Sequence, residues 1–304
     1  MSEFDDPVVL RNFIEGLQTG VYLVGKDGKI HFWSDGAQRI LGHKRQDILG
    51  RAAREDLFAH AEGNQTAIEE ALGALSAVFR DGRPVTTDVS LRHKDGHRIR
   101  VVLRAVPIRS GDGEIIGVAE SFDEPFSNST WERRRTKLAG YHCLDEVTGV
   151  HNHAITQSHL RENLAIFAEY RIPVSILAIQ IDQLEHFRTT YGPGALAAIF
   201  RAVAQTLDTS LRPTDFLGRY TEQYFLAILP ECSDSDIAKV AERMKKMVTY
   251  AEIKWWGDDL SVTASFGGAT SQKGDTVESL VERAEKSLAD SIAVGGNCFE
   301  LCTE

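Results

Sequence analysis

The first part of the chain alternates short apolar runs with glycine-centred turns. Residues 20–33, GVYLVGKDGKIHFW, contain two such runs around Lys-Asp-Gly-Lys, which predicts a β-hairpin. Residues 35–50 have a helical period punctuated by glycines, and a longer helical stretch follows around residues 64–80. Three strand-like runs end this part, at residues 84–93, 97–109 and 114–122. This order predicts an antiparallel sheet with helices on one face, an α+β fold.

From Asp145 the pattern changes to helices that alternate with strands. Residues 173–182, PVSILAIQID, form the apolar, β-branched run that a strand covered on both faces needs. Residues 215–220 and 224–230 predict two strands around the stretch RYTEQYF at 219–225, although this turn contains no glycine. Further helices are predicted at 159–170, 194–211, 234–248 and 277–292, and further strands at 260–270 and 297–301. The second part is therefore expected to be an α/β sheet covered by helices.

Composition limits the classes of function. A chain of 304 residues with 42% hydrophobic and 26% charged residues is typical of two globular domains. A net charge of −10 argues against nucleic acid as the main partner. The N-terminus does not resemble a signal peptide, and no apolar run approaches the ~20 residues of a membrane span, so we expect a cytoplasmic protein. The scattered cysteines fit free thiols and no metal site: Cys143, Cys232, Cys298 and Cys302.

The boundaries that follow are a first domain at 8–124, a helical linker at 125–144 and a second domain at 145–304. The linker carries a basic cluster, Arg133 to Lys137. A helix that pairs with its copy in a homodimer is favoured over a nucleic-acid contact.

The first domain resembles a PAS domain. The resemblance rests on DGKIHFWSDGAQRILGH, which looks like the family's second strand and first helices, and on HKDGHRIRVVLRAVPIRSGDGEIIGVAESF, which looks like its last three strands. It implies a sensing or dimerising role and names no ligand. No histidine spacing favours haem or a metal ion, so the PAS ligand is left unknown.

The second domain resembles the GGDEF domains, the diguanylate cyclases. DEVTGVHNH at 145–153 looks like the family's opening signature, ILAIQIDQLEHFRTTYG like its first strand and helix, and AEKSLADSIAVGGN like its closing motif. The resemblance implies a nucleotidyl-cyclase-like α/β fold. In this frame RYTEQYF stands where the family has R-Y-G-G-D-E-F, the active-site hairpin.

The resemblance also implies which residues perform the chemistry, and most of them are replaced. The family binds Mg²⁺ through two carboxylates, whose positions are occupied by Gln180 and Gln223, while Asp182 remains. The residues at its phosphate- and guanine-binding positions are Thr221, Glu222, Glu185, Arg188, Ala197, Ile292 and Gly296. Ile292 instead extends the apolar row of Ala284 and Leu288 at helical spacing. We therefore expect no catalytic residue, no metal site and no cofactor in this domain.

One group of family residues is retained. Arg212, Asp215 and Arg243 fall at the positions of the R-x-x-D inhibitory site that binds cyclic di-GMP. Guanidinium groups can clamp phosphates and guanine edges, and a carboxylate accepts from guanine N–H groups. A surface ion pair between Arg212 and Asp215 explains the same residues without a ligand.

Three functions remain open from the sequence. The first is a catalytically inactive signalling adaptor or cyclic di-GMP receptor, homodimeric through its PAS domain and linker, with an unknown protein partner. The second is an active diguanylate cyclase or a divergent relative with Glu222, Asp182 and Glu185 as metal ligands. The third is a protein-interaction module in which Tyr220 and Tyr224 form a docking face while Phe225 belongs to the core.

Overall fold

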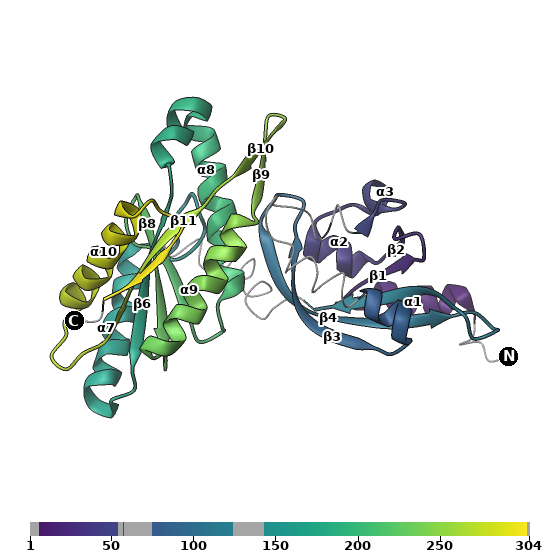
Figure 1. The fold of residues 1–304 in the computed structure, drawn as a ribbon, viewed down its shortest axis with the longest axis horizontal. Coiled ribbons are helices and arrows are strands. Elements are labelled where there is room, and N and C mark those ends of the chain that lie inside the picture. The colour runs from purple at the N-terminus through teal and green to yellow at the C-terminus, as the bar shows by residue number, and fades with distance from the viewer. Residues whose placement is uncertain (1–5, 54–56, 58–74, 124–142, 303–304) are drawn as a thin grey trace. The chain divides into compact units, whose positions relative to one another are not determined.

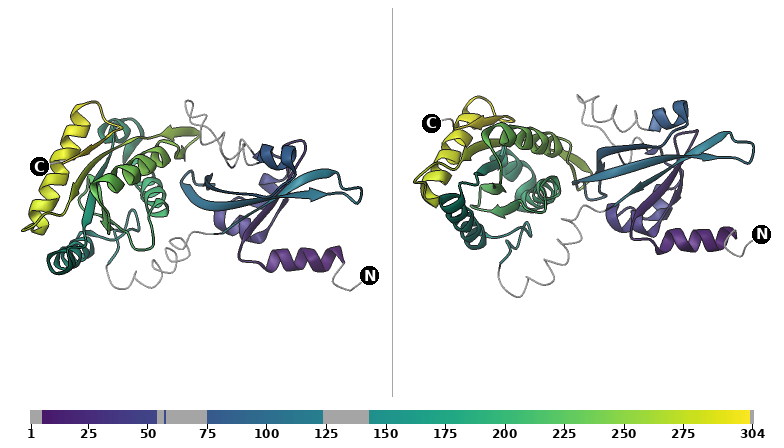
Figure 2. Two further views of the ribbon diagram at one scale, coloured as in Figure 1. Left: turned by 60° about the horizontal axis from the view of Figure 1, so that its bottom comes forward. Right: turned by 90° about the horizontal axis from the view of Figure 1, so that it is seen from below.

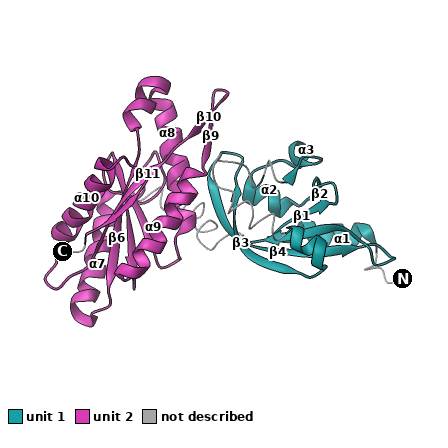
Figure 3. Cartoon of the chain, viewed as in Figure 1, with its two compact units in different colours: residues 1–125 teal, residues 126–304 magenta. Residues whose placement is uncertain are grey.

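The computed structural model describes residues 6–53, 57, 75–123 and 143–302. Its contacts divide the chain into an N-terminal unit, residues 1–125, and a C-terminal unit, residues 126–304 (Figure 3). The helical linker predicted at 125–144 lies almost entirely outside the described residues. Within the described ranges, no helix is both long and apolar enough to cross a membrane.

The N-terminal unit is built on one antiparallel sheet (Figure 1). The predicted hairpin and the three predicted final strands are confirmed, and the order across the sheet is β2-β1-β5-β4-β3. Gly28, at φ 74°, allows the tight turn between the first two strands. The strands are β1 (Gly20–Gly25), β2 (Ile30–Trp33), β3 (Val85–Arg92), β4 (Arg98–Arg109) and β5 (Ile115–Phe122).

Short helices accompany this sheet. The helical period at 35–50 gives α2 (Asp35–Leu41) and α3 (Arg45–Ile48), and Gly42 at φ 73° ends α2. Residues 75–81 are helical, whereas the earlier part of the predicted helix at 64–80 lies outside the described residues. The main core fills one sheet face and includes Tyr22, Trp33, Leu41, Leu91, Leu103 and Phe122.

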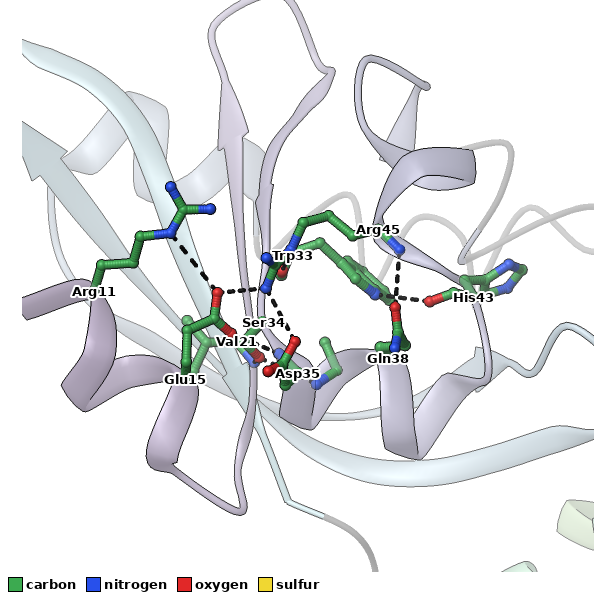
Figure 4. A network of polar contacts seen from close by, with 10 residues as sticks. Arg11, Glu15, Val21, Trp33, Ser34, Asp35, Gln38, His43 and Arg45 are labelled. Carbon is green, nitrogen blue, oxygen red and sulfur yellow. Dashed lines mark hydrogen bonds and ion pairs between the residues drawn. The ribbon is translucent and has the colours of Figure 1, made fainter. Parts of the chain in front are cut away.

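An additional helix, α1 (Pro7–Gly16), was not predicted from the sequence. None of its residues is buried, and its attachment is polar (Figure 4). Glu15 accepts the Asp35 backbone N–H at 2.8 Å and forms an ion pair with Arg45. Arg45 also donates to the Trp33 carbonyl at 2.8 Å, so this network ties α1 to the start of α2.

The C-terminal unit has a mixed five-stranded sheet in the order β12-β11-β6-β8-β7. β11 and β12 are parallel, and the other pairs are antiparallel. Its strands are β6 (Val174–Ile181), β7 (Phe216–Arg219), β8 (Tyr224–Pro230), β11 (Ala264–Thr270) and β12 (Phe299–Leu301).

Helices cover both faces of this sheet, as Figure 1 and the two views of Figure 2 show. Alternate residues of β6 divide between the faces: Leu177 and Ile179 pack with α8 and α9, whereas Ile176 and Ala178 pack with α7 and α10. The expected α/β sheet covered by helices is thus confirmed. The helices are α7 (His153–Tyr170), α8 (Leu184–Ser210), α9 (Asp234–Thr249) and α10 (Val277–Ala293).

Three predicted elements differ from the structure. The helix expected at 159–170 begins six residues earlier, at His153. The prediction of a single strand at 260–270 is wrong. Its first residues belong to β10 (Asp258–Ser261), which pairs with the unpredicted β9 (Glu252–Trp255) in a separate hairpin, and β11 starts only at Ala264. The helix expected at 194–211 begins earlier and joins a preceding helix across Gly192, whose φ of 80° and ψ of 178° are non-helical. A glycine followed by Pro193 explains this kink.

Candidate functional site

The turn between β7 and β8, residues 220–223, lies next to the end of β6. In the sheet register, Gln180 of β6 stands opposite Tyr224 of β8 on one side and Ser265 of β11 on the other. The fold therefore gathers this turn and the ends of three strands in one place, which we call the hairpin site.

This turn closes without glycine because none of its four residues has a positive φ. The Thr221 hydroxyl accepts the backbone N–H groups of Gln223 and Tyr224, both at 3.2 Å. The Arg219 guanidinium donates to the carbonyls of Thr221 at 3.3 Å and Glu222 at 2.7 Å. The side chains of Thr221 and Arg219 thus satisfy backbone N–H and C=O groups of the turn, so that no glycine is required.

Arg219 is itself held from the other side. Its guanidinium carbon lies 3.8 Å from the centre of the Phe200 ring, a cation–π contact. Asp145 forms an ion pair with it at 3.9 Å and also accepts the Thr148 backbone N–H at 2.8 Å. The opening DEVTG motif is therefore a turn that supports the hairpin.

Asp182, the acid that remains at the end of β6, is fully engaged in hydrogen bonds. Its Oδ1 accepts the Ser265 hydroxyl at 2.6 Å. Its Oδ2 accepts the Thr263 hydroxyl at 2.6 Å and the Asn297 backbone N–H at 3.0 Å. Asn297 adopts φ 51° to reach it. The carboxylate thus fastens the start of β11 and the loop after α10.

The other residues expected at the hairpin site are exposed, half-buried or paired with a neighbour. Glu222 and Gln223 are exposed at the turn, and Gln180 is half-buried. Glu185 forms an exposed ion pair with Arg188 at 2.9 Å on α8. Ile292 does not continue the buried row, because it is 39% exposed while Leu288 is buried.

Tyr224 does not fit the predicted docking face. It is only 7% exposed, and its hydroxyl donates to Glu285 at 2.7 Å. Burial, followed by this hydrogen bond, raises the pKa of Tyr224. Tyr220 is half-buried against the His153 ring at 4.5 Å, and Phe225 is completely buried, as predicted.

A second cluster lies where α8 ends and β7 begins, and we call it the Arg212 site. Asp215 accepts the Arg212 backbone N–H at 2.8 Å. Arg243, on α9, donates to the Ser210 carbonyl at 2.9 Å. Burial raises the pKa of Asp215, and the charges of Arg212 and Arg243 oppose this rise. The three retained residues are therefore within electrostatic reach of one another, with Arg212 exposed to solvent.

Sequence reasoning missed the side chains that support these groups. The Thr221 hydroxyl, the Arg219 contacts and the partners of Asp182 were not singled out. The polar residues Thr263 and Ser265 at the start of an otherwise apolar strand were the available signal.

Comparison with known families agrees with this architecture. The family described as diguanylate cyclase, GGDEF domain, matches residues 142–298, just over half of the chain. The family described as PAS fold matches residues 10–120.

Curated relatives match through the C-terminal unit. The response regulator PleD of Caulobacter vibrioides is 30% identical over 156 residues, which are 50% of this chain and 34% of PleD. The diguanylate cyclase DosC of Escherichia coli is 26% identical over 159 residues, 52% of this chain and 35% of DosC. The chain thus spans about a third of the length of the curated relatives it matches.

Solved structures give the same result. The GGDEF domain of DgcB from Caulobacter crescentus, in complex with c-di-GMP, is 25% identical with a TM-score of 0.52, covering 53% of this chain and 94% of that one. The diguanylate cyclase SiaD from Pseudomonas aeruginosa, in complex with its activator SiaC, shares the fold at 24% identity and a TM-score of 0.52, over 57% of this chain and 68% of SiaD. With a PAS fold followed by this domain, the chain belongs to the GGDEF, or diguanylate cyclase, family.

Proposed function

We propose that this chain is a PAS–GGDEF signalling protein that no longer joins GTP molecules and instead binds cyclic di-GMP at the Arg212 site. The observation that carries the proposal is the convergence of Arg212, Asp215 and Arg243 in a domain whose hairpin site lacks the family's metal acids.

The residues at the hairpin site do not fit Mg²⁺. The ion prefers several anionic oxygens at near-ideal octahedral geometry. Gln180 and Gln223 are neutral, and both oxygens of Asp182 already accept hydrogen bonds from Thr263, Ser265 and Asn297. Binding a metal would break bonds that hold β11 in place.

The nucleotide side of the hairpin site is also unfavourable. Glu222 adds a negative charge at the turn, and the exposed Glu185–Arg188 pair occupies the start of α8. A triphosphate needs cations and close backbone N–H groups around its oxygens. These substitutions together support loss of catalysis.

The Arg212 site has the charge and geometry for a cyclic dinucleotide. The exposed Arg212 guanidinium is able to clamp a phosphate or a guanine edge with two parallel hydrogen bonds. Asp215 offers an acceptor for guanine N–H groups, and Arg243 adds a second positive charge. DgcB, a structural relative solved with c-di-GMP, provides a precedent for this ligand on the same fold.

Calorimetric titration of the full chain with cyclic di-GMP tests the receptor function. We expect saturable binding that Arg212→Ala weakens by about tenfold or more, as expected for a charge-assisted pair. Arg161→Ala, an exposed arginine on α7, is the matched control and should bind normally. Absence of binding, or equal affinity in the two variants, would exclude the receptor function.

An active cyclase is the second candidate, favoured by the retained Asp182 and by relatives such as DosC. Incubation with GTP and either Mg²⁺ or Mn²⁺, followed by chromatography, distinguishes the two. We expect no cyclic di-GMP. Product that disappears in Glu222→Gln would establish a cyclase with unusual ligands instead.

We also propose that two copies pair through the N-terminal unit. Val8, Leu10 and Phe13 on α1 are apolar and exposed, which is typical of a helix that packs on a partner. Light scattering after gel filtration should show a dimer that Phe13→Glu dissociates, while the matched surface variant Val294→Glu leaves it intact.

A further inference from the structure

Glu120 is a completely buried carboxyl in the N-terminal unit. It lies on β5 between Val118 and Phe122, whose side chains share its sheet face and are also buried. Within the part of the chain that the structure describes, its oxygens lie near the Tyr22 hydroxyl but make no hydrogen bond of normal geometry. The Tyr22 hydroxyl makes none there either. Buried acids without a partner are rare, because desolvation costs several kcal/mol, roughly.

The position of Glu120 separates two parts of the core. In the sheet register it stands opposite Tyr22 of β1 and Ala105 of β4. Tyr22 and Phe122 belong to the main apolar cluster, whereas Ala105 and Val118 belong to a smaller cluster with Val78. The carboxyl therefore lies at the boundary between two apolar groups, with a small side chain on one side.

Aromatic rings stand around this boundary. The Tyr22 ring lies 5.5 Å from the Trp33 ring and 6.0 Å from the Phe122 ring, centre to centre. Aromatic faces attract cations, and a desolvated carboxylate forms its strongest hydrogen bonds with charged N–H donors. A carboxylate beside Tyr22 and Phe122, with Trp33 packed on Tyr22, is thus suited to a small organic cation.

No side chain of the described sheet supplies that cation. The buried Arg98 is also on β4, but seven residues from Ala105, which is roughly 20 Å along an extended strand. Burial raises the pKa of Glu120 to about 7, and the nearby Tyr22 hydroxyl opposes this rise. An acid with a protein cation beside it would show the opposite shift.

We propose that the interior of the N-terminal unit binds a small organic cation, an amine, amidine or guanidine, whose N–H groups donate to Glu120 and whose body packs on Tyr22, Trp33 and Phe122. This site is independent of the Arg212 site and gives the PAS fold a defined class of ligand.

The test uses the full chain and two pairs of probes: benzamidine with its neutral counterpart benzamide, and phenethylamine with 2-phenylethanol. We expect the cations to bind in calorimetric titrations and to raise the unfolding temperature, with the neutral members at least about tenfold weaker. Glu120→Gln should remove this preference. Glu114→Gln, a matched change at an exposed glutamate on the same unit, should keep it.

The comparison of charged and neutral probes on the unchanged chain does not depend on any variant folding. Failure of both cations to bind at millimolar concentration, or equal binding of benzamidine and benzamide, would overturn the proposal. Equal benzamidine affinity in a folded Glu120→Gln variant, checked by circular dichroism, would also overturn it.

Discussion

A single buried carboxyl has a measurable consequence for the stability of the N-terminal unit. The pKa of Glu120 rises from 4.5 to about 7 on folding, which corresponds to roughly 3 kcal/mol of lost stability once the group is ionised. Between these two pH values the folded state keeps a proton that the unfolded state has released. The free energy of unfolding therefore falls as pH rises through this window and levels off above it.

Glu120→Met should remove this pH dependence. Methionine has a similar length and no charge, so it fits the same space without a desolvated carboxylate. We expect the variant to be more stable than the original chain at pH 8, by roughly 1–3 kcal/mol, and nearly equal to it at pH 4.5. Urea unfolding at several pH values measures this, and a variant with an unchanged pH profile would contradict the assignment.

The Thr221 hydroxyl stabilises the β7–β8 turn, which contains no glycine. Thr221→Val keeps the shape of the side chain but leaves two backbone N–H groups without their acceptor. The expected loss is about 1 kcal/mol, because water partly replaces these exposed bonds. Urea unfolding of this variant beside Thr190→Val, an exposed threonine on α8, isolates the effect.

At the scale of elements, the β9–β10 hairpin contains a strained residue. Its turn residues Trp256 and Gly257 have φ values of 51° and 100°, and Trp256 is 91% exposed. Positive φ at both central positions favours Asn-Gly, whereas a bulky side chain is unfavourable there. The sequence signal for this hairpin is therefore weak, so periodicity predicts one strand over residues 260–270 and does not predict β9.

Trp256→Asn should stabilise the hairpin. Asparagine tolerates positive φ, and Trp256 buries little surface that would be lost. We expect a gain of roughly 0.5–1 kcal/mol in the free energy of unfolding. Trp256→Val, which is disfavoured at positive φ, should instead destabilise the chain, and a gain of the same size in both variants would show that strain is not the cause.

At the scale of the whole molecule, the sequence predicts both folds but not the hydrogen bonds and packing that hold the residues of either site in place. The central strand β6 and the helix pattern follow from local periodicity, which a sequence displays directly. Arg212, Asp215 and Arg243 were identified only through the resemblance to the GGDEF family, and their role stays a prediction. The hydrogen bonds of Asp182 and the burial of Tyr224 depend on which distant strands become neighbours. The polar attachment of α1 depends on Arg45, far along the chain, for the same reason.

Each unit has its own apolar core, so the two should unfold separately. The main core of the N-terminal unit includes Phe122, and that of the C-terminal unit includes Phe225. Scanning calorimetry of the full chain should resolve two transitions. Glu120→Met should raise only one of them and Thr221→Val should lower only the other. A single transition that both variants shift would mean that the units unfold cooperatively.

The hydrogen bonds of Asp182 also bear on the evolutionary history of the domain. An acid in place of Gln180 would bring negative charge within two residues of Asp182, whose carboxylate already accepts three hydrogen bonds. Like charges near one another repel, so this substitution would lower stability before any metal could compensate. If catalysis has been lost as proposed, intermediates on the way back would be disfavoured. The same three hydrogen bonds that stabilise the present fold would then make recovery of a metal site energetically unfavourable.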